Sequence, residues 1–258
     1  MLFSQFYTTF ANIQSIIMLH LIIIIFLLCI CASFIQRTTG FGFGVFIMTV
    51  LPYLMPSYGE ATTLSGLLAM SNSMVICYKM RHYLDLRRLL PILTTFIIVS
   101  TFAIFCLKRM DDALLHTILG VALILVSIYF IFFSSRIKIP ANKKGQITAG
   151  TISGLLGGFF GAQGPPAVLY FVSTVKDKNQ YMALMQSYLL CGNIMMTMVR
   201  AYNGFLTPTV GWDYLYGIGG VAIGTTLGAY VFKHIPNRWF RYVVYCYIGI
   251  SGIIMLIV

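Results

Sequence analysis

Two short runs in this chain combine glycine with side chains that donate hydrogen bonds. The first run reads QRTTGFGFG at positions 36–44, and the second reads GAQGPP at positions 161–166. Glycine lets the backbone approach a ligand closely, and proline fits the first turn of a helix but not its middle. Each run therefore predicts a point where one helix ends and the next one begins.

A helix that begins at such a break carries backbone amides that have no partner within the helix. These amides and the aligned peptide dipoles attract anions, so the predicted chemistry is noncovalent binding of a small anion. We expect no catalytic residue, no metal ligand and no cofactor. The expected substrate-binding residues lie in the two runs or at polar positions of other helices: Gln36, Arg37, Thr38, Thr39, Gly40, Phe41, Gly42, Asn72, Gly161, Ala162, Gln163, Gly164, Gln186 and Asn193.

Some positions in and near these runs have a second, purely structural interpretation. Arg37 either lines the binding site or extends its side chain to the membrane surface. Asn72 and Asn193 either contact the substrate or join neighbouring helices through hydrogen bonds. Three glycines before the second break are spaced as in closely packed membrane helices: Gly150, Gly154 and Gly158.

The elements that hold these residues are expected to be membrane helices. The chain of 258 residues is 59% hydrophobic and only 9% charged, whereas about a quarter of the residues in a soluble domain are charged. Its uncharged blocks reach the roughly 20 residues that a membrane-spanning helix needs. A helix break at membrane depth is tolerated only where it is buried in protein or lines a polar cavity. The composition therefore predicts an all-α, polytopic integral membrane protein.

Several other classes of protein are disfavoured by the composition. The net charge of +11 is spread over short loops, where basic residues orient membrane helices rather than bind nucleic acid. The six cysteines lie in apolar blocks and form no CxxC pair, which favours a packing role. There is no P-loop and no Cys/His metal motif, so we expect a protein that is not an enzyme. We also expect no cleaved signal peptide, because residues 1–12 carry no lysine or arginine.

The basic residues predict an orientation in the membrane. Thirteen of the seventeen lie in the segments 79–88, 134–145, 176–178 and 233–241, which we expect to be cytoplasmic. The opposite side then keeps Lys108, Arg109 and Arg200, while Arg37 stands in the first break. This assignment requires that the interrupted segments 13–56 and 146–175 each return to the side from which they started. Both termini are then outside, and complete helices are expected near 58–79, 89–107, 112–133, 180–200, 211–232 and 238–258.

The same elements occur in both halves of the chain with opposite orientation. At an offset of about 121 residues, like residues coincide in three pairs: Gly40 with Gly161, Asn72 with Asn193, and Lys79 with Arg200. We therefore expect two inverted-topology repeats, 1–135 and 146–258, joined by a basic cytoplasmic linker at 136–145. Each repeat would be an interrupted helix hairpin followed by three transmembrane helices. Transporters of this design bind substrate near the membrane midplane, where the discontinuous helices meet.

The positions of the acidic residues also indicate the charge of the substrate. No aspartate or glutamate lies in the middle of an expected span, so a proton relay or an acidic sodium site has no obvious components. Glu60 is the only glutamate and stands at the head of its span, which favours a role in starting the helix over a role as proton carrier. A cationic substrate would find no counter-charge, whereas an anion would find the helix starts and Arg37.

On these residues the chain resembles the TauE/SafE family of membrane permeases. The resemblance rests on the apolar helix that leads into QRTTGFGFG, on GLLGGFFGAQGPP in the second half, and on the polar-centred helices that follow. It implies a bacterial inner-membrane protein in two related halves that moves sulfite or related sulfur-containing anions, commonly outward, without a cofactor. Family members carry a glycine-rich run before a proline in the second half. Ala162 and Gln163 depart from that run, and Gln163 is expected to change the donors beside the anion.

The expected function is that of a secondary transporter or uniporter for a small sulfur oxyanion, sulfite or an organosulfonate, in the export direction. Alternating access around the two breaks is the expected mechanism. Two alternatives remain open, namely an anion channel and a membrane assembly or insertion factor. The expected partners are the anionic substrate and the lipid bilayer, with no nucleic acid, and a homodimer is one arrangement that the sequence leaves open.

Overall fold

The computed structural model describes residues 2–107, 109–110, 121, 142–236, 238–240 and 242, with side chains from residue 19 onward. Within these residues every regular element is helical, which confirms the predicted all-α class. The elements are α1 (Leu2–Thr39), α2 (Phe43–Ile47), α3 (Leu51–Leu54), α4 (Tyr58–Met80), the 3-10 helix η1 (Arg81–Tyr83), α5 (Leu86–Leu107), α7 (Lys143–Phe160), α8 (Gly164–Thr174), α9 (Lys178–Tyr202) and α10 (Pro208–His234). The helix predicted at 112–133, nearly all of that at 238–258 and most of the linker at 136–145 lie outside the described residues.

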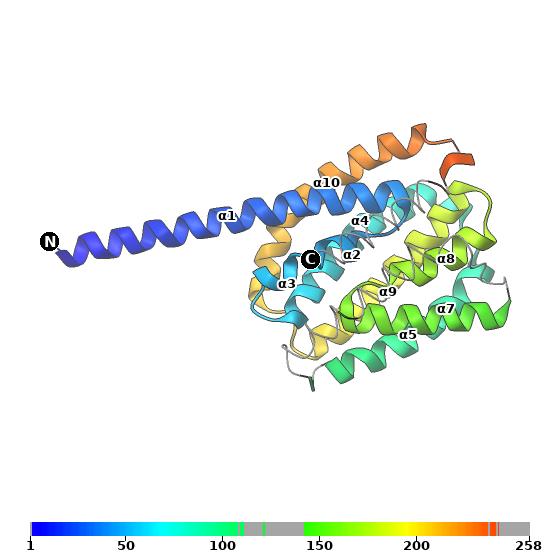
Figure 1. The fold of residues 1–258 in the computed structure, drawn as a ribbon, viewed down its shortest axis with the longest axis horizontal. Coiled ribbons are helices and arrows are strands. Elements are labelled where there is room, and N and C mark those ends of the chain that lie inside the picture. Colours follow the sequence, from blue (N-terminus) through cyan, green and yellow to red (C-terminus); the bar gives the residue numbers. More distant parts are fainter. Residues whose placement is uncertain are drawn as a thin grey trace.

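Among the described residues, four helices are long and apolar enough to cross a membrane: Leu19–Thr39, Leu86–Leu107, Lys178–Tyr202 and Pro208–His234. Large apolar side chains on their outer faces are exposed, among them Ile98, Phe102 and Leu215. Lipid covers such faces in a membrane protein, so these exposures agree with the predicted class. The first helix has 38 residues, about 57 Å at 1.5 Å per residue, and its N-terminal half extends well past the rest of the bundle (Figure 1).

Polar residues define where the helices begin. The Ser57 hydroxyl accepts a hydrogen bond from the amide of Glu60 (3.2 Å) at the start of α4, and Asp177 accepts bonds from the amides of Asn179 and Gln180 at the start of α9. Such caps satisfy amides that have no partner within the helix. The carboxylate of Glu60 also accepts a bond from Thr207 (2.8 Å), so Glu60 has the helix-start position that was favoured for it.

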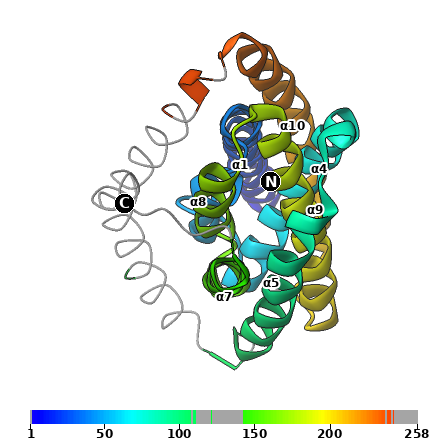
Figure 2. The same ribbon diagram turned by 90° about the vertical axis from the view of Figure 1, so that its right-hand side faces the viewer.

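Glycine seams join two pairs of helices. A Cβ added at Gly150, Gly154 or Gly158 of α7 would lie 2.5–2.8 Å from atoms of α5. A Cβ added at Gly220 or Gly224 of α10 would lie 2.2–2.4 Å from backbone oxygens of α1. The close-packing interpretation of Gly150, Gly154 and Gly158 is therefore confirmed. Seen along the bundle, α7 lies beside α5 and α1 beside α10 (Figure 2).

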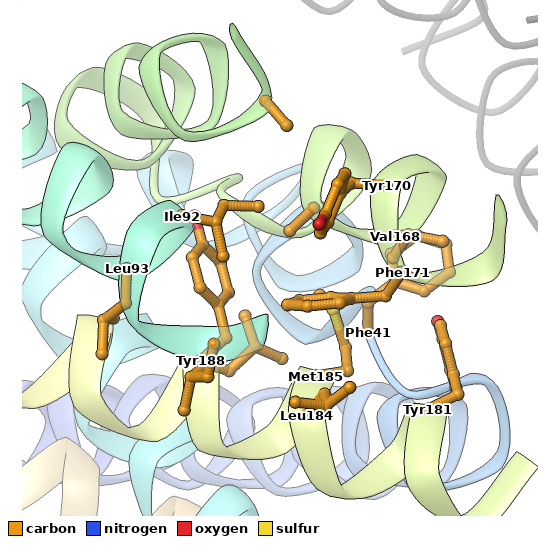
Figure 3. Close-up of a cluster of buried hydrophobic side chains, with 14 of the residues drawn as sticks. Phe41, Ile92, Leu93, Val168, Tyr170, Phe171, Tyr181, Leu184, Met185 and Tyr188 are labelled. Carbon is orange, nitrogen blue, oxygen red and sulfur yellow. The ribbon is translucent and has the colours of Figure 1, made fainter. Parts of the chain in front are cut away.

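The two central helices, α4 and α9, pack against each other. Around them, α5 packs on α9 and α10 on α4, while the short helix α2 contacts α4 and α8 contacts α9. One buried apolar cluster is built mainly from α5, α8 and α9, and it includes Phe41 from the first break (Figure 3). A second cluster is built mainly from the first half and includes Phe160 and Ala162 from the second break. Each break therefore contributes apolar side chains to the core of the other half.

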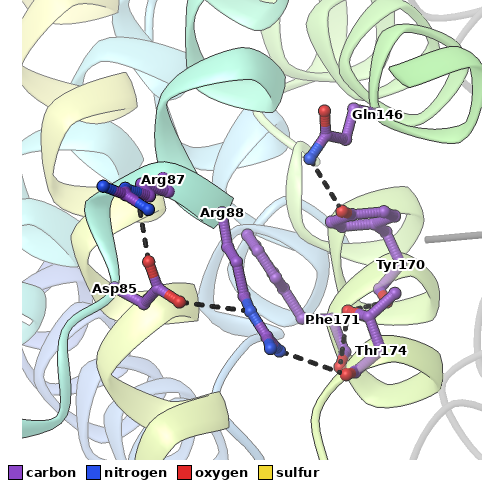
Figure 4. A network of polar contacts seen from close by, with 7 residues as sticks. All are labelled: Asp85, Arg87, Arg88, Gln146, Tyr170, Phe171 and Thr174. Carbon is purple, nitrogen blue, oxygen red and sulfur yellow. Dashed lines mark hydrogen bonds and ion pairs between the residues drawn. The ribbon is translucent and has the colours of Figure 1, made fainter. Parts of the chain in front are cut away.

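Several basic segments meet at one end of the bundle. Arg88 pairs with Asp85 (3.2 Å) and donates to the carbonyl of Thr174 (3.3 Å), which joins the start of α5 to the end of α8 (Figure 4). Lys178 donates to the carbonyl of Phe232 (3.0 Å), which joins the start of α9 to the end of α10. Three of the four segments that the sequence places on one side of the membrane therefore lie near one another, and most of the fourth, 134–145, is outside the described residues.

Candidate functional site

The two helix breaks meet backbone to backbone in the middle of the bundle. Positive φ angles, which favour glycine, occur at Gly40 (93°) and Gly42 (101°) in the first break and at Gly161 (67°) in the second. A Cβ added at Gly44 would lie only 2.2 Å from the carbonyl oxygen of Gly161. The two runs that were singled out in the sequence are thus in direct contact, and only glycine permits that contact.

A small cavity lies where the breaks meet. Its volume is about 20 Å³, by a measure in which one water molecule needs roughly 10–15 Å³. None of its lining residues is exposed, and they come from α1, both breaks, α4 and α9: Gln36, Gly42, Phe43, Gly44, Val45, Thr62, Ser65, Gly66, Ala69, Gly161, Ala162, Gln163, Gly164, Leu189, Asn193 and Arg200. Half of the fourteen expected binding residues are among them.

Arg200 is the charged residue of this cavity. Its side chain is 0% exposed, although we had counted it among the charges on one side of the membrane. Its Nη1 donates to the carbonyl of Thr62 (3.1 Å), and its Nη2 donates to the carbonyls of Gly157 (3.0 Å) and Gly158 (3.2 Å). Its Nε is buried and has no hydrogen-bond partner among the described residues. The cation is therefore held by backbone oxygens, not by a carboxylate.

An amide pair lies on the same cavity. Gln163 donates from Nε2 to Oδ1 of Asn193 (2.8 Å), while Oε1 of Gln163 and Nδ2 of Asn193 are buried without a partner in the described part of the chain. The carbonyl of Gln163 accepts a hydrogen bond from Ser153, whose hydroxyl accepts one from Tyr188 (2.7 Å). The second break is thus fixed on both sides, and the pair leaves one donor and one acceptor for a ligand.

The first break is held by a buried network of side chains. Gln36 donates to Ser73 (2.8 Å) and to Gln186 (2.9 Å), and Gln186 donates to the carbonyl of Gly40 (2.7 Å). The network joins α1, α4 and α9 to the break. Oε1 of Gln36 has no partner among the described residues, and Gln36 lines the cavity. Gln186 supports the site from behind, since it is not one of the lining residues.

Six other expected residues do not line the cavity either. Thr39 donates to the backbone carbonyls of Ile35 and Phe41 (both 2.9 Å), and Phe41 belongs to the apolar core. Asn72 donates to the carbonyl of Ser33 (3.5 Å) and accepts from Thr225 (2.7 Å), so it joins α4 to α1 and α10. Gly40 accepts from Gln186 as described above. Arg37 and Thr38 are also buried, and Arg37 lies against Gly228 and Phe232 of α10.

A spacing in the sequence could have identified Arg200. Gln186, Asn193 and Arg200 recur every seven residues, which places them on one face of α9. The helix continues for two residues beyond Arg200. Arg200 is therefore a helix residue and not a loop residue, and its side chain is buried within the bundle. The apolar block before it ends at position 199, and this made Arg200 look like a loop residue.

The lining suits an anion. Of the described residues on the cavity wall, Arg200 is the one with a charge, and none is a carboxylate. The amides of Phe43, Gly44 and Val45 precede the first hydrogen bond of α2, from the amide of Phe46 to the carbonyl of Gly42 (2.9 Å). Among the described residues no group of histidine, cysteine, aspartate and glutamate could hold a metal ion.

Apolar helices that span a membrane, with two helix breaks around a buried cation, define a multi-pass membrane protein. The family model for the sulfite exporter TauE/SafE matches residues 25–255, and the chain belongs to that family. This confirms the resemblance noted in the sequence and indicates a membrane transporter for a sulfur-containing anion. No curated protein and no solved structure matches the chain.

Proposed function

We propose that the protein carries sulfite or an organosulfonate out of the cell through the cavity between the two breaks. The observation that supports this most directly is Arg200, a fully buried cation without a carboxylate partner in a cavity of the described structure. A buried unpaired charge is costly, and a bound anion offsets that cost. Charge-assisted hydrogen bonds from a guanidinium to an oxyanion are also among the strong ones.

In this proposal Arg200, Asn193 and Gln163 hold the anion. Nε of Arg200 and Nδ2 of Asn193 are donors that have no partner among the described residues, so each can bond to the anion directly. The backbone amides at the start of α2 are further donors. Nη1 and Nη2 of Arg200 now donate to backbone carbonyls, and either can donate to a substrate oxygen instead. The free-energy cost of this exchange is small, because one hydrogen bond replaces another. No covalent step and no cofactor are required.

Alternating access is the mechanism that we propose, with the two halves as inverted repeats. The packing supports this, because exchanging α1 with α7, α2 with α8, α4 with α9 and α5 with α10 turns every major packed pair into another packed pair. The helices α1 and α7 also run in opposite directions along the bundle (Figure 1). A cavity for little more than one water must widen before an oxyanion fits, and relative movement of the halves provides the space.

Export is the direction that the membrane potential favours for an anion in this proposal. Each negative charge that leaves a negative interior gains roughly 2.3 kcal/mol per 100 mV of membrane potential. The gradient in potential therefore supplies a driving force without a coupling ion. This agrees with the absence of acidic residues from the cavity wall.

The test is uptake of radiolabelled sulfite by liposomes that contain the purified protein. We expect saturable flux in the wild type and a reduction of about tenfold to a hundredfold in Arg200→Gln, since one or two charge-assisted hydrogen bonds are lost. Arg87→Gln is the matched control, because Arg87 is exposed and only its backbone amide is bonded to Asp85. Wild-type flux in Arg200→Gln would refute the site. Flux that never saturates would indicate a channel, and no flux of any sulfur anion would refute the substrate.

A further inference from the structure

A second cluster of positive charge lies outside the cavity, around the ring of Phe232. The guanidinium of Arg37 lies 5.1 Å from the centroid of this ring, and Nζ of Lys178 lies 4.8 Å from the same centroid. Lys178 is held there, since it also donates to the carbonyls of Phe232 (3.0 Å) and Ile235 at the end of α10. Two cations thus share one aromatic side chain.

Arg37 is buried and forms no ion pair with the described carboxylates. Its side chain is 4% exposed, and its Nη1 is buried without a hydrogen-bond partner among the described residues. The described part of the chain contains four carboxylates, and the ion pair found there joins Asp85 to Arg88, not to Arg37. The ring of Phe232 contributes only a modest cation–π attraction. A second cation beside the same ring raises the cost further by repulsion.

The cluster is separate from the cavity but adjacent to it. Arg37 follows Gln36, which lines the cavity, yet it lies on the face of α1 that packs against α10. A Cβ added at Gly228 of α10 would lie 2.7 Å from Cβ of Arg37. Lys178 is the first residue of α9, at the end of the bundle where the basic segments meet. The cluster therefore lies between that basic end and the cavity.

We propose that Arg37 and Lys178 form a second binding site, which takes a small oxyanion. An oxyanion there would lie beside both cations and accept a hydrogen bond from Nη1 of Arg37, which offsets the cost of burying that guanidinium. If the proposed function holds, the natural ligand is the transported anion on its way to the cavity. The phosphate of a lipid headgroup has the same chemistry and is the other source of such a ligand.

The first experiment counts the sites by equilibrium binding of radiolabelled sulfite to purified, delipidated protein. We expect two sites in the wild type, one in Arg37→Gln, one in Arg200→Gln and none in the double variant. Lys233→Gln is the control, because Lys233 is exposed near the same end of α10 and should leave both sites. Two sites in Arg37→Gln, or a single wild-type site that only Arg200→Gln removes, would overturn the proposal.

Further variants keep the test independent of folding and of the proposed function. Lys178→Gln should also lose the second site, and Arg37→Lys should keep it with weaker affinity, because lysine retains the charge but not the guanidinium donors. If Arg200→Gln changes nothing while Arg37→Gln removes a site, the cavity assignment fails and the second site stands. Titration with phosphatidylglycerol distinguishes the sources: a fall from two sulfite sites to one identifies a lipid phosphate, and two unchanged sites identify a free anion.

Discussion

The two buried arginines of the described structure have different surroundings. Arg200 is held by the carbonyls of Thr62, Gly157 and Gly158, which come from both halves of the chain. Arg37 instead lies against Phe232, beside Lys178. A guanidinium bonded to carbonyls can exchange them for ligand oxygens, and it also ties α9 and α7 to α4. Arg200 is thus suited to bind an anion. Binding would change its hydrogen bonds to α4 and α7, which belong to different halves of the chain.

Gln163 offers a direct test of that exchange. In Gln163→Glu a carboxylate enters the cavity of Arg200 and acts as an internal anion. At about 5 Å and an effective dielectric constant of about 20, such a pair gains roughly 3 kcal/mol of Coulomb energy. We therefore expect Gln163→Glu to lose sulfite flux while its melting temperature stays level or rises. Gln163→Met, which is neutral and of similar length, should keep measurable flux. Full flux in Gln163→Glu would contradict this account of the site.

At the level of elements, the breaks are fixed by contacts that run between the halves. Phe41 of the first break is buried in the core of the second half, and Ala162 of the second break is buried in the core of the first. Burying a side chain as large as phenylalanine contributes about 1.5–3 kcal/mol. In the proposed mechanism, separation of the breaks therefore has to preserve or replace these contacts.

The contact between the breaks leads to a prediction about glycine. Gly44→Ala places a methyl group 2.2 Å from the carbonyl oxygen of Gly161, and overpacking of this kind costs about 1–3 kcal/mol. We expect a lower melting temperature and strongly reduced flux. Gly211→Ala is the control, because a Cβ there has no neighbour within 4 Å, and helical alanine is favourable. Equal stability of the two variants would show that the breaks do not touch.

Much of this arrangement could be predicted from the sequence, and some of it could not. Apolar runs and caps are local signals, so the predicted helix at 58–79 corresponds to α4 and that at 180–200 to α9. The two glycine runs identified the breaks because no other residue type suits them. The roles of Arg37 and Arg200 depend on which face of a helix meets a neighbour. That is a property of packing, which is why the sequence left two alternatives for Arg37 and did not predict the burial of Arg200.

For the whole molecule, the packing of the basic segments leads to a prediction about orientation in the membrane. The joining of α5 to α8 and of α9 to α10 places several basic segments at one end of the bundle. Basic loops of membrane proteins are retained in the cytoplasm. The membrane potential would then push an anion bound near that end toward the opposite face.

Thiol labelling from one side of the membrane tests this orientation. In a variant without native cysteines, we expect Lys233→Cys to react with an impermeant maleimide in inverted vesicles but not in intact spheroplasts. Trp212→Cys, which is exposed near the other end of α10, should show the opposite pattern. Labelling of Lys233→Cys from outside would refute the proposed orientation without affecting the binding sites.

The meeting of the two breaks also has a pharmacological consequence. Around Gly44 and Gly161 much of the cavity wall is main chain, which amino-acid substitution cannot delete. An inhibitor that bonds to those amides and carbonyls would leave a cell few routes to resistance by substitution. A side chain added at Gly44 to exclude the drug would collide with the second break and disable the transporter as well.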